Sequence, residues 1–379
     1  MKSELRSICI IVPSLVAGGA ERVVVSLANE FVRRGYQTAL VSLLSGSQLK
    51  YLIDRRVELV EINASRFRFG FLQLVMFLKR SRFDVLVANM WPITILVLFA
   101  KWLSASTARV TFVEHATWSQ SASLDGRLKR LLFKISVSLL YPFSSAVVCV
   151  SKGAASDLQN FCSLPTELIR VIYNPVSIDI PTPSEFAVIR EMRVVEKWLA
   201  SSVPVIAVGS LKKEKDFSTL LRAVAISTTQ MDIKLMIVGE GPERPILEAL
   251  IKDLGLDSRV FLVGYVEKPS LFVGLAAVHI LCSYTEAFPL VLVEALGLGI
   301  PVISTDCPSG PTEILEGGAY GLLVPVGDAQ TLAQALIAQR FRAFDPDSLR
   351  CRAREFSVTL AATRYLEVFG QSIGEKSWV

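Results

Sequence analysis

The sequence lacks any apolar run long enough to cross a membrane, although 51% of its 379 residues are hydrophobic and its mean hydropathy is +0.47. A membrane-spanning helix needs about 20 consecutive apolar residues. The longest apolar stretch, residues 85–100, is interrupted by Asn89 and Pro92, and residues 135–150 contain Pro142. These interruptions argue against an integral membrane protein. The length instead predicts two domains of about 150–200 residues, each with its own core.

The sequence shows neither a secretory signal nor paired cysteines. The residues from Met1 to Pro13 lack the apolar region and cleavage site of a secretory signal, so we expect a cytoplasmic protein. No C-x-x-C pair occurs, which argues against a zinc site or a disulfide framework. We therefore expect the cysteines to be buried thiols: Cys9, Cys149, Cys162, Cys282, Cys307 and Cys351.

Negative charge is scarce in the first half of the chain. Residues 1–190 hold 22 Lys and Arg against 13 Asp and Glu, a net charge of +9, which leaves 18 against 22, or −4, for residues 191–379. No helix-turn-helix, zinc-finger or RNA-recognition signature is present, which argues against nucleic acid as the partner. The cations alternate with large apolar residues at positions 66–71 and 127–134. We expect these segments to contact an anionic membrane surface; core helices with a solvated face are the alternative.

Short β-branched runs alternate with amphipathic segments along the chain, which is typical of parallel sheets covered by helices on both faces. We therefore expect an α/β fold with two doubly wound, Rossmann-like domains. The predicted strands are Ile8–Val12, Thr38–Leu43, Val57–Ile62, Val85–Ala88, Arg109–Val113, Ala146–Val150, Val205–Val208, Lys234–Val238, Val260–Val263, Val278–Leu281, Val302–Ser304 and Gly321–Val324.

Turn and breaker residues concentrate between Asn174 and Pro204, where the sequence predicts the domain boundary. We assign residues 1–185 to the first domain and residues 186–355 to the second. Two helices are predicted for the tail, Pro346–Phe356 and Thr359–Phe369. Ligands of open α/β sheets bind beyond the carboxyl ends of the strands, so we expect the site in a cleft between the domains.

Glycine-rich turns follow several predicted strands. Gly18 and Gly19 precede a helix whose first amides suit an anion, although a purely structural glycine pair is equally consistent. Residues 209–217 place three lysines beyond a strand end, which suits a diphosphate; a solvated charge cluster is the alternative. The turns at residues 239–244 and 264–265 either approach a flat base with their backbone or are structural.

The most specific pattern is a pair of glutamates, Glu286 and Glu294, separated by seven residues. The first precedes a predicted helix, and the second lies inside one that is otherwise apolar. A buried glutamate without a partner is destabilising by several kcal/mol. We therefore expect Glu294 to meet a ligand hydroxyl or a cation; a surface position is the alternative.

The chain resembles the retaining nucleotide-sugar glycosyltransferases of family 4. The motifs that carry this resemblance are, in chain order, residues 18–21, Lys215, residues 239–242 and the pair Glu286 and Glu294. The resemblance covers nearly the whole chain. It implies the GT-B fold, in which two Rossmann-like domains face a cleft and a C-terminal segment, here residues 356–379, returns to the N-terminal domain.

The resemblance also implies an activity. Bacterial members of the family extend lipid-linked surface glycans, so we expect transfer of a hexose or N-acetylhexosamine from a nucleotide sugar, expected to be UDP-linked. The acceptor would be a saccharide on a polyprenyl diphosphate, as in polysaccharide or lipopolysaccharide synthesis. The enzyme would lie peripherally on the cytoplasmic face of the inner membrane.

Roles for individual residues follow from the resemblance alone. Lys215 would bind the donor diphosphate, Glu294 the ribose, and Glu286 the donor sugar. His115, which follows a predicted strand, matches a histidine at the acceptor side, whereas His279 is expected to be structural. The implied catalytic residues are His115, Lys215 and Glu286. The implied donor-binding residues are Gly18, Gly19, Ser210, Lys215, Gly239, Glu240, Gly264, Tyr265, Phe288, Pro289, Leu290 and Glu294.

Two residues depart from the family pattern. Ser210 stands where members commonly have Arg, which leaves the diphosphate one cation short unless Lys212 or Lys213 substitutes. Ala287 replaces the usual Gly, and its methyl group narrows the sugar pocket or strains the loop. A catalytically weak or inactive GT-B subunit and a nucleotide-sugar epimerase are therefore the alternatives.

The only D-x-D sequence, residues 345–347, fits the start of a helix better than a metal site. Asp345 suits the N-cap, and Pro346 suits the first helical position. We therefore expect no cofactor and no obligatory metal ion.

Overall fold

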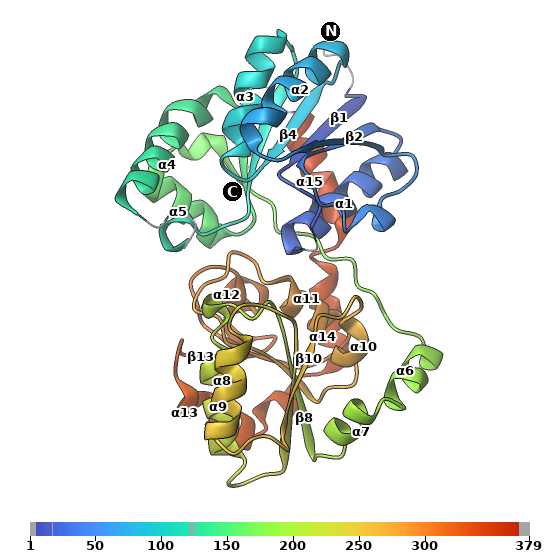
Figure 1. The fold of residues 1–379 in the computed structure, drawn as a ribbon, viewed down its shortest axis with the longest axis vertical. Coiled ribbons are helices and arrows are strands. Elements are labelled where there is room, and N and C mark those ends of the chain that lie inside the picture. Colours follow the sequence, from blue (N-terminus) through green and yellow to red (C-terminus); the bar gives the residue numbers. More distant parts are fainter. Residues whose placement is uncertain (1–4, 17, 122–123, 125, 371–379) are drawn as a thin grey trace. The chain divides into compact units, whose positions relative to one another are not determined.

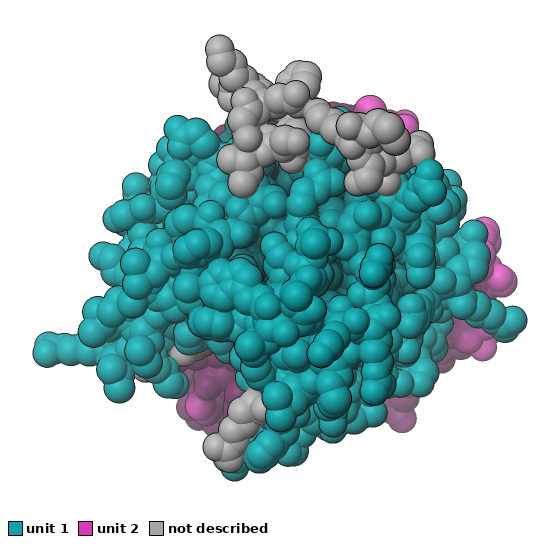
Figure 2. Space-filling model, turned by 90° about the horizontal axis from the view of Figure 1, so that it is seen from above, with its two compact units in different colours: residues 1–176, 356–379 teal, residues 177–355 magenta. Residues whose placement is uncertain are grey.

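The computed structural model describes residues 5–16, 18–121, 124 and 126–370. The chain divides into two compact units: unit 1, residues 1–176 and 356–379, and unit 2, residues 177–355 (Figure 2). The predicted boundary after residue 185 falls instead inside helix α6 (Pro183–Arg190), because a capping box of Thr182 and Glu185 starts a helix there. Residues 371–379 of the predicted returning segment lie outside the described residues.

Unit 1 is built on a parallel sheet. Its strands are β1 (Ser7–Val12), β2 (Gln37–Leu44), β3 (Glu58–Ala64), β4 (Val85–Asn89), β5 (Arg109–Glu114), β6 (Ala146–Cys149) and β7 (Ile169–Val171). They lie in the order β3-β2-β1-β4-β5-β6-β7. In the register of the central strands, Ile8 pairs with Thr38 of β2 and Val85 of β4. All positions of β1 are buried, as expected for a strand covered on both faces.

The helices of unit 1 cover this sheet (Figure 1). They are α1 (Gly19–Arg33), α2 (Phe67–Arg80), α3 (Ile93–Ser104), α4 (Arg127–Leu140), α5 (Lys152–Cys162) and α15 (Val358–Gly370), with short 3₁₀ turns η1 (Lys50–Leu52), η2 (Trp118–Gln120), η4 (Tyr141–Phe143) and η5 (Thr166–Leu168). In α1 the buried Val24, Leu27, Ala28 and Phe31 recur at helical spacing and form the core face.

Unit 2 repeats the plan with a six-stranded parallel sheet. The strands are β8 (Val203–Val208), β9 (Ile233–Val238), β10 (Val260–Gly264), β11 (Val278–Leu281), β12 (Val302–Thr305) and β13 (Leu322–Val324). Their order is β10-β9-β8-β11-β12-β13. Besides α6, the helices are α7 (Arg193–Leu199), α8 (Phe217–Ser227), α9 (Arg244–Asp253), α10 (Ser270–Val273), α11 (Leu290–Gly297), α12 (Gly310–Ile314), α13 (Ala329–Ile337) and α14 (Pro346–Arg354), with 3₁₀ turns η6 (Lys213–Lys215), η7 (Glu316–Gly318) and η8 (Arg340–Ala343).

The predicted elements agree closely with the observed ones. Every predicted strand coincides with an observed strand, and the two tail helices are α14 and α15. The sequence misses β7, a three-residue edge strand that pairs only with β6 and is interrupted by the charged Arg170. Within the described ranges, no helix combines the length and the apolarity needed to cross a bilayer.

The prediction for the cysteines is wrong at one position. Five of the six thiols are buried and free, but Cys351 is exposed. It lies on α14 between the buried Leu349 and Ala353, two residues from each. A two-residue step in a helix turns the side chain to the opposite face, which here is the solvent face.

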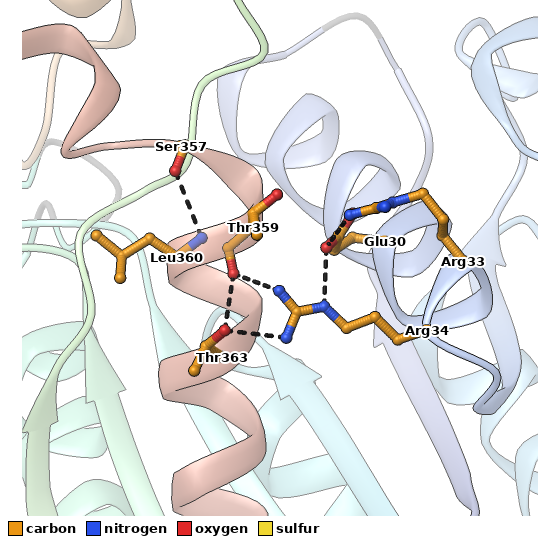
Figure 3. A network of polar contacts seen from close by, with 7 residues as sticks. All are labelled: Glu30, Arg33, Arg34, Ser357, Thr359, Leu360 and Thr363. Atoms are coloured by element: carbon orange, nitrogen blue, oxygen red, sulfur yellow. Dashed lines mark hydrogen bonds and ion pairs between the residues drawn. The ribbon is translucent and has the colours of Figure 1, made fainter. Parts of the chain in front are cut away.

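The helix α15 is held on α1 by a polar network (Figure 3) and by packing of the Phe369 ring against that of Phe31, with ring centroids 5.9 Å apart. Arg34, directly after α1, donates hydrogen bonds to the Thr359 carbonyl at 2.5 Å and to Thr363 Oγ1 at 2.9 Å. Its Nε also donates to the buried Glu30 at 2.8 Å. Burial opposes the charge of Glu30, but hydrogen bonds from Arg33 and Arg34 outweigh it and hold the pKa of this carboxyl below its usual value.

We expect Arg34→Ala to lower the free energy of unfolding by about 1–2 kcal/mol, because it removes the hydrogen bonds between α1 and α15. Urea denaturation followed by circular dichroism measures this change. Arg33→Ala is the matched control, since Arg33 also pairs with Glu30 but its side chain is 60% exposed; it should lower the free energy of unfolding far less than Arg34→Ala does. Equal effects of the two substitutions would contradict the role given to Arg34.

Candidate active site

The order of the strands in unit 2 predicts where a ligand binds. The connections from β8 to β9 and from β11 to β12 leave in opposite directions along the sheet, so the order reverses between β8 and β11. In doubly wound sheets the loops at such a point diverge and leave a crevice at the carboxyl ends of the strands. Lys215 follows β8 and Glu286 follows β11, so both belong to this switch point.

The structure brings Lys215 and Glu286 into direct contact. The Lys215 Nζ lies 2.5 Å from Glu286 Oε1, and the Ser283 hydroxyl donates to the same oxygen at 2.6 Å. The two loops are also joined by the backbone, because the Tyr284 amide donates to the Glu214 carbonyl at 2.8 Å. Both charged side chains are largely shielded, with 24% of Lys215 and 11% of Glu286 exposed. A cation and a carboxylate are therefore held together at the carboxyl edge of the sheet.

Three glycine turns pack against one another at the same edge. A Cβ atom on Gly239 would lie 1.9 Å from the Gly209 carbonyl oxygen, and one on Gly241 would lie 2.4 Å from the Leu211 carbonyl oxygen. Gly239 also has a φ of 147°, and its amide donates to Gly264 at 2.8 Å. These glycines are required by contact between backbones, whatever further contact they make with a ligand.

The charged and aromatic residues of these turns are more open than the glycines. Glu240 is half exposed and pairs with Arg244 Nη1 at 2.6 Å. Arg244 also bonds Glu248 at 2.9 Å and the Leu262 carbonyl at 3.2 Å, so it ties the turn after β9 to β10. Tyr265 is 58% exposed. The sequence does not single out Arg244 or Ser283, although both lie within or beside the quoted motifs.

The loop from Glu286 to Leu290 leads into α11. Phe288 and Pro289 are buried and Leu290 is half-buried, so these apolar side chains anchor the loop on the core of unit 2. A Cβ on Gly310 would lie 2.8 Å from Phe288 Cα, which places the start of α12 directly against this loop. Glu294 is half-buried between buried neighbours in α11. Its exposure therefore lies between the buried position and the surface position that the sequence left open.

Ser210 and the lysines after it lie on the loop that follows β8. Ser210 is half-buried and Lys212 and Lys213 are exposed. The Lys212 amide donates to the Ser210 carbonyl at 2.8 Å, which folds the loop tightly at the serine. Ser210, where the resemblance implies an Arg, thus carries no charge, and the nearest cations in sequence, Lys212 and Lys213, are exposed to solvent.

In unit 1, His115 lies directly after β5 and is surrounded by amides. Its Nε2 lies 3.1 Å from Asn89 Oδ1 at the end of β4. Its Nδ1 has no partner among the described residues, and neither does the Oδ1 of the buried Asn174. Burial lowers the pKa of His115 to about 4, with Asn174 opposing the shift. The sequence analysis does not identify Asn89 or Asn174 as site residues, because neither carries a charge or lies beside a catalytic residue type in the chain.

A buried polar network adjoins His115. Glu114 accepts hydrogen bonds from Trp118 Nε1 at 2.9 Å and from the Tyr141 hydroxyl, which also bonds Thr94 at 2.9 Å. Burial raises the pKa of Glu114 to about 7, and the hydrogen bonds from Tyr141 and Trp118 oppose this shift. The network joins α3, β5, η2 and η4 and so fixes the loop that carries His115.

The remaining candidates have simple local roles. Gly18 is the N-cap of α1 and Gly19 its first residue. His279 is fully buried in β11, and burial lowers its pKa to about 4, which confirms its position inside a strand. Asp345 caps α14 by accepting from the Ser348 amide at 2.8 Å, with Pro346 at the first helical position, as predicted. In the part of the chain that the structure describes, no three His, Cys, Asp or Glu side chains gather as metal ligands would.

Two family models match this chain. Residues 17–180 match the model described as Glycosyltransferase Family 4, and residues 189–339 match Glycosyl transferases group 1. The fold and the family models therefore define a glycosyltransferase of the GT-B class. The chain belongs to the family 4 glycosyltransferases, as the resemblance indicated.

Named relatives act on lipid-linked saccharides. One, from Campylobacter jejuni, is N-acetylgalactosamine-N,N'-diacetylbacillosaminyl-diphospho-undecaprenol 4-alpha-N-acetylgalactosaminyltransferase; it is 31% identical over 64% of this chain and 62% of its own length. A second C. jejuni relative is a GalNAc-alpha-(1->4)-GalNAc-alpha-(1->3)-diNAcBac-PP-undecaprenol alpha-1,4-N-acetyl-D-galactosaminyltransferase, 26% identical over 97% of this chain and 99% of its own. The chain thus spans less than two thirds of the first relative and nearly all of the second.

A solved structure shares the fold along nearly the whole chain. Alr3699/HepE of Anabaena in complex with UDP-glucose superposes with a TM-score of 0.80 at 20% identity, and covers 95% of this chain and 98% of its own. At this identity the likeness establishes the fold alone.

We expect Gly239→Ala to destabilise unit 2 by about 2–4 kcal/mol, because the new methyl group must displace the Gly209 backbone. Thermal unfolding measures the change. Gly255→Ala is the control: Gly255 has a φ of 65° but nothing within 4 Å of its Cβ position, so only the backbone conformation costs about 1–2 kcal/mol. If the two variants unfold alike, the close contact between the turns is not what requires glycine at position 239.

Proposed function

We propose that this glycosyltransferase moves a hexose or N-acetylhexosamine from a UDP-sugar to a saccharide carried on a polyprenyl diphosphate, with retention of the anomeric configuration. The observation that carries the proposal is the contact of Lys215 with Glu286 at the switch point of the unit 2 sheet. The acceptor class is supported by the two C. jejuni relatives, whose names specify undecaprenol-linked saccharides. UDP as carrier is supported by the UDP-glucose complex of the Anabaena structure.

Lys215 supplies the charge that the reaction needs. As the bond between the sugar C1 and the diphosphate breaks, negative charge grows on the leaving diphosphate, and a fixed cation in a shielded site stabilises it. Lys215 is held ready by Glu286 and is three-quarters shielded from solvent. When the diphosphate attracts the ammonium group, Glu286 keeps its bond from Ser283 and turns its free carboxylate oxygen to the hydroxyls of the sugar.

The new bond to C1 forms on the same face of the sugar as the one on which the old bond breaks. The acceptor oxygen attacks C1 from the side of the leaving group, the C1–oxygen bond to the diphosphate breaks, and the acceptor proton passes to a diphosphate oxygen. No enzyme nucleophile is used, so the Lys215–Glu286 pair acts by electrostatics and positioning. Glu294 binds the ribose hydroxyls, the turns at Gly239–Glu240 and Gly264–Tyr265 frame the base, and the amides of Phe288 and Leu290 donate hydrogen bonds to sugar or phosphate oxygens. We propose that no metal ion is required.

We expect Lys215→Ala to lower kcat by about 100- to 1,000-fold, as for loss of one group that stabilises a transition-state charge. Glu294→Ala should raise the KM of the donor about tenfold or more through lost hydrogen bonds. Release of UDP is measured with a panel of UDP-sugars and a short-chain polyprenyl diphosphate saccharide, with and without the acceptor and with EDTA.

Lys252→Ala is the control for these variants, because Lys252 is an exposed cation of unit 2 on α9. It should leave turnover unchanged, and all three variants should melt at the temperature of the parent. Unaltered turnover in both Lys215→Ala and Glu294→Ala would overturn the site. Dependence on a divalent ion that EDTA abolishes would overturn the metal-independent step, and absence of any UDP release would favour an inactive subunit.

We further propose that unit 1 rests on an anionic bilayer through α4. Only Phe133 and Val137 of this helix are buried. On another face, Leu128, Leu131, Leu132, Ile135 and Leu139 form a stripe at spacings of three and four residues, each between 46% and 69% exposed. We call these five residues the leucine stripe. A helix with a second, solvent-facing apolar stripe is typical of the membrane interface.

Cations and aromatic rings adjoin the leucine stripe. Arg127, Lys129 and Lys134 of α4 are exposed beside it, which complements an anionic surface. The stripe continues one turn beyond Leu139 to Phe143, whose ring packs edge-on against Trp102 of α3 at 5.4 Å; both rings are at least 44% exposed. Exposed tryptophan beside apolar residues suits the headgroup level of a bilayer. Of the three phenylalanines within residues 66–71, by contrast, Phe67 and Phe71 pack on the core and Phe69 is exposed.

We expect Leu131→Ser combined with Leu132→Ser to weaken binding to phosphatidylglycerol vesicles at least tenfold, from the apolar area lost at about 25 cal/mol per Å². Co-sedimentation at low salt measures this. The control is Val188→Ser with Ile246→Ser, two apolar residues of unit 2 that are more exposed than Leu131 and Leu132; this variant should bind as the parent does. Equal loss in both pairs, or equal binding of the parent to phosphatidylcholine and phosphatidylglycerol, would contradict the proposal.

A further inference from the structure

Arg352 of α14 is a largely buried cation that the proposed reaction does not use. Its side chain is 11% exposed. All three of its nitrogen atoms are engaged: Nε donates to the Ile314 carbonyl at 2.9 Å, Nη2 to the Glu313 carbonyl at 2.7 Å, and Nη1 to Glu355 at 2.6 Å. The guanidinium carbon also lies 5.4 Å from the centre of the Tyr320 ring. A planar group bound on so many sides has one position, so the backbone that it binds is held with it.

The two carbonyl groups that Arg352 binds lie at the carboxyl end of α12. Glu313 and Ile314 are the last two residues of this five-residue helix. The last carbonyls of a helix have no amide partner within the helix, and they form the negative end of its dipole. A cation that donates two hydrogen bonds there satisfies the carbonyls and complements the dipole at once. Arg352 therefore fixes the carboxyl end of α12 on α14.

The other end of α12 packs against the loop of residues 286–290, which we call the donor loop. A Cβ atom on Gly310, the first residue of α12, would lie 2.5 Å from Pro289 Cδ and 2.8 Å from Phe288 Cα. It would also lie 3.0 Å from the Ala287 carbonyl oxygen. These are backbone and ring atoms, which cannot give way as a flexible side chain does. Because a helix of five residues is only about 7 Å long, a shift at its carboxyl end reaches the donor loop.

We propose that Arg352 is a positioning residue of the donor site and that it acts through α12. By holding the carboxyl end of α12, Arg352 keeps the start of this helix against the donor loop. The amides of Phe288 and Leu290 thereby stay aimed at the sugar and phosphate oxygens of the donor. The inference rests on the proposed function for the identity of its ligand, whereas the mechanical link from Arg352 to the donor loop can be measured without one.

Arginine suits this position in a way that lysine does not. Its planar group places separate nitrogens before the carbonyls of two successive residues, while Nη1 still reaches Glu355. A lysine ammonium is a compact charge on one nitrogen and cannot present that fork. The two carboxylates beside Arg352, Glu355 and Glu316, are both more than half exposed, and exposed ion pairs contribute little to stability. The hydrogen bonds to α12 are therefore the contacts through which Arg352 acts.

The first experiment measures the link from Arg352 to the donor loop without any substrate. Hydrogen–deuterium exchange of the free protein is followed by mass spectrometry. We expect Arg352→Gln to speed exchange about tenfold in peptides covering residues 308–316 and residues 284–292, since hydrogen bonds from a charged donor are lost. Arg354→Gln is the control, because Arg354 is an exposed arginine of the same helix; it should change neither peptide. Faster exchange in residues 308–316 alone would overturn the inference, because α12 would then loosen without the donor loop.

The second experiment tests the consequence for the donor, at a temperature at which circular dichroism shows every variant to be folded. Arg352→Gln should raise the KM of the UDP-sugar about tenfold and change the KM of the lipid-linked acceptor by about twofold or less, because only donor contacts are displaced. Arg352→Lys keeps the charge beside the carbonyls and should return the donor KM to within about threefold of the parent. Arg354→Gln should leave both KM values unchanged.

Thr312→Val tests the same path without changing Arg352. Thr312 of α12 bonds Asp306 in the loop after β12, so this variant also frees the start of α12 and should raise the donor KM. Because both residues act through one helix, the double variant should raise the KM by less than the product of the single effects. An effect equal to that product, or an unchanged donor KM in Arg352→Gln, overturns the inference even where transfer proceeds. Absence of transfer in the parent protein instead overturns the proposed function, and the exchange experiment still decides whether Arg352 holds the donor loop.

Discussion

The parallel direction of all strands is the constraint on which the rest of the structure depends. In each sheet every strand runs parallel to its neighbours, so all carboxyl ends open on one edge. Helices cover both faces and leave only that edge for chemistry. The candidate functional side chains all follow strands, either directly or after a short loop. They are Lys215 and Glu286 in unit 2 and His115 in unit 1. Their positions are a consequence of the connectivity before any side chain is considered.

The same edge explains why glycine is needed there. Loops that leave neighbouring parallel strands are crowded, since strands lie only about 4.8 Å apart. In unit 2 the turns after β8, β9 and β10 contact each other through backbone atoms, with Gly239 against Gly209 and against Gly264. A side chain at Gly239 would separate the turns. Close packing of the turns is thus by itself sufficient to require glycine at position 239.

The fold could be predicted from the sequence because buried parallel strands are short, apolar and β-branched, and this signal is local. The strand β7 was not predicted, because an edge strand has only one neighbouring strand and tolerates a charged residue such as Arg170. Within the site, Lys215 and Glu286 were found as separate residues, but their contact joins positions 71 residues apart and depends on the order of the strands. Asn89 and Asn174 gave no signal, because an amide becomes informative only when its hydrogen-bond partner is known.

The apolar excess of the chain has two physical origins that a mean hydropathy cannot separate. The first is the interior of the two sheets, where strands such as β1 are buried throughout. The second is α4, in which Phe133 and Val137 are buried in the core and five further apolar residues are turned to the outside. Because buried and exposed stripes of one helix differ only in direction, the sequence alone left core packing and membrane contact as equal alternatives. Leu128 and Leu139, both more than 60% exposed, take no part in the core, and this uncovered apolar surface is why we propose the anionic bilayer as the partner of α4.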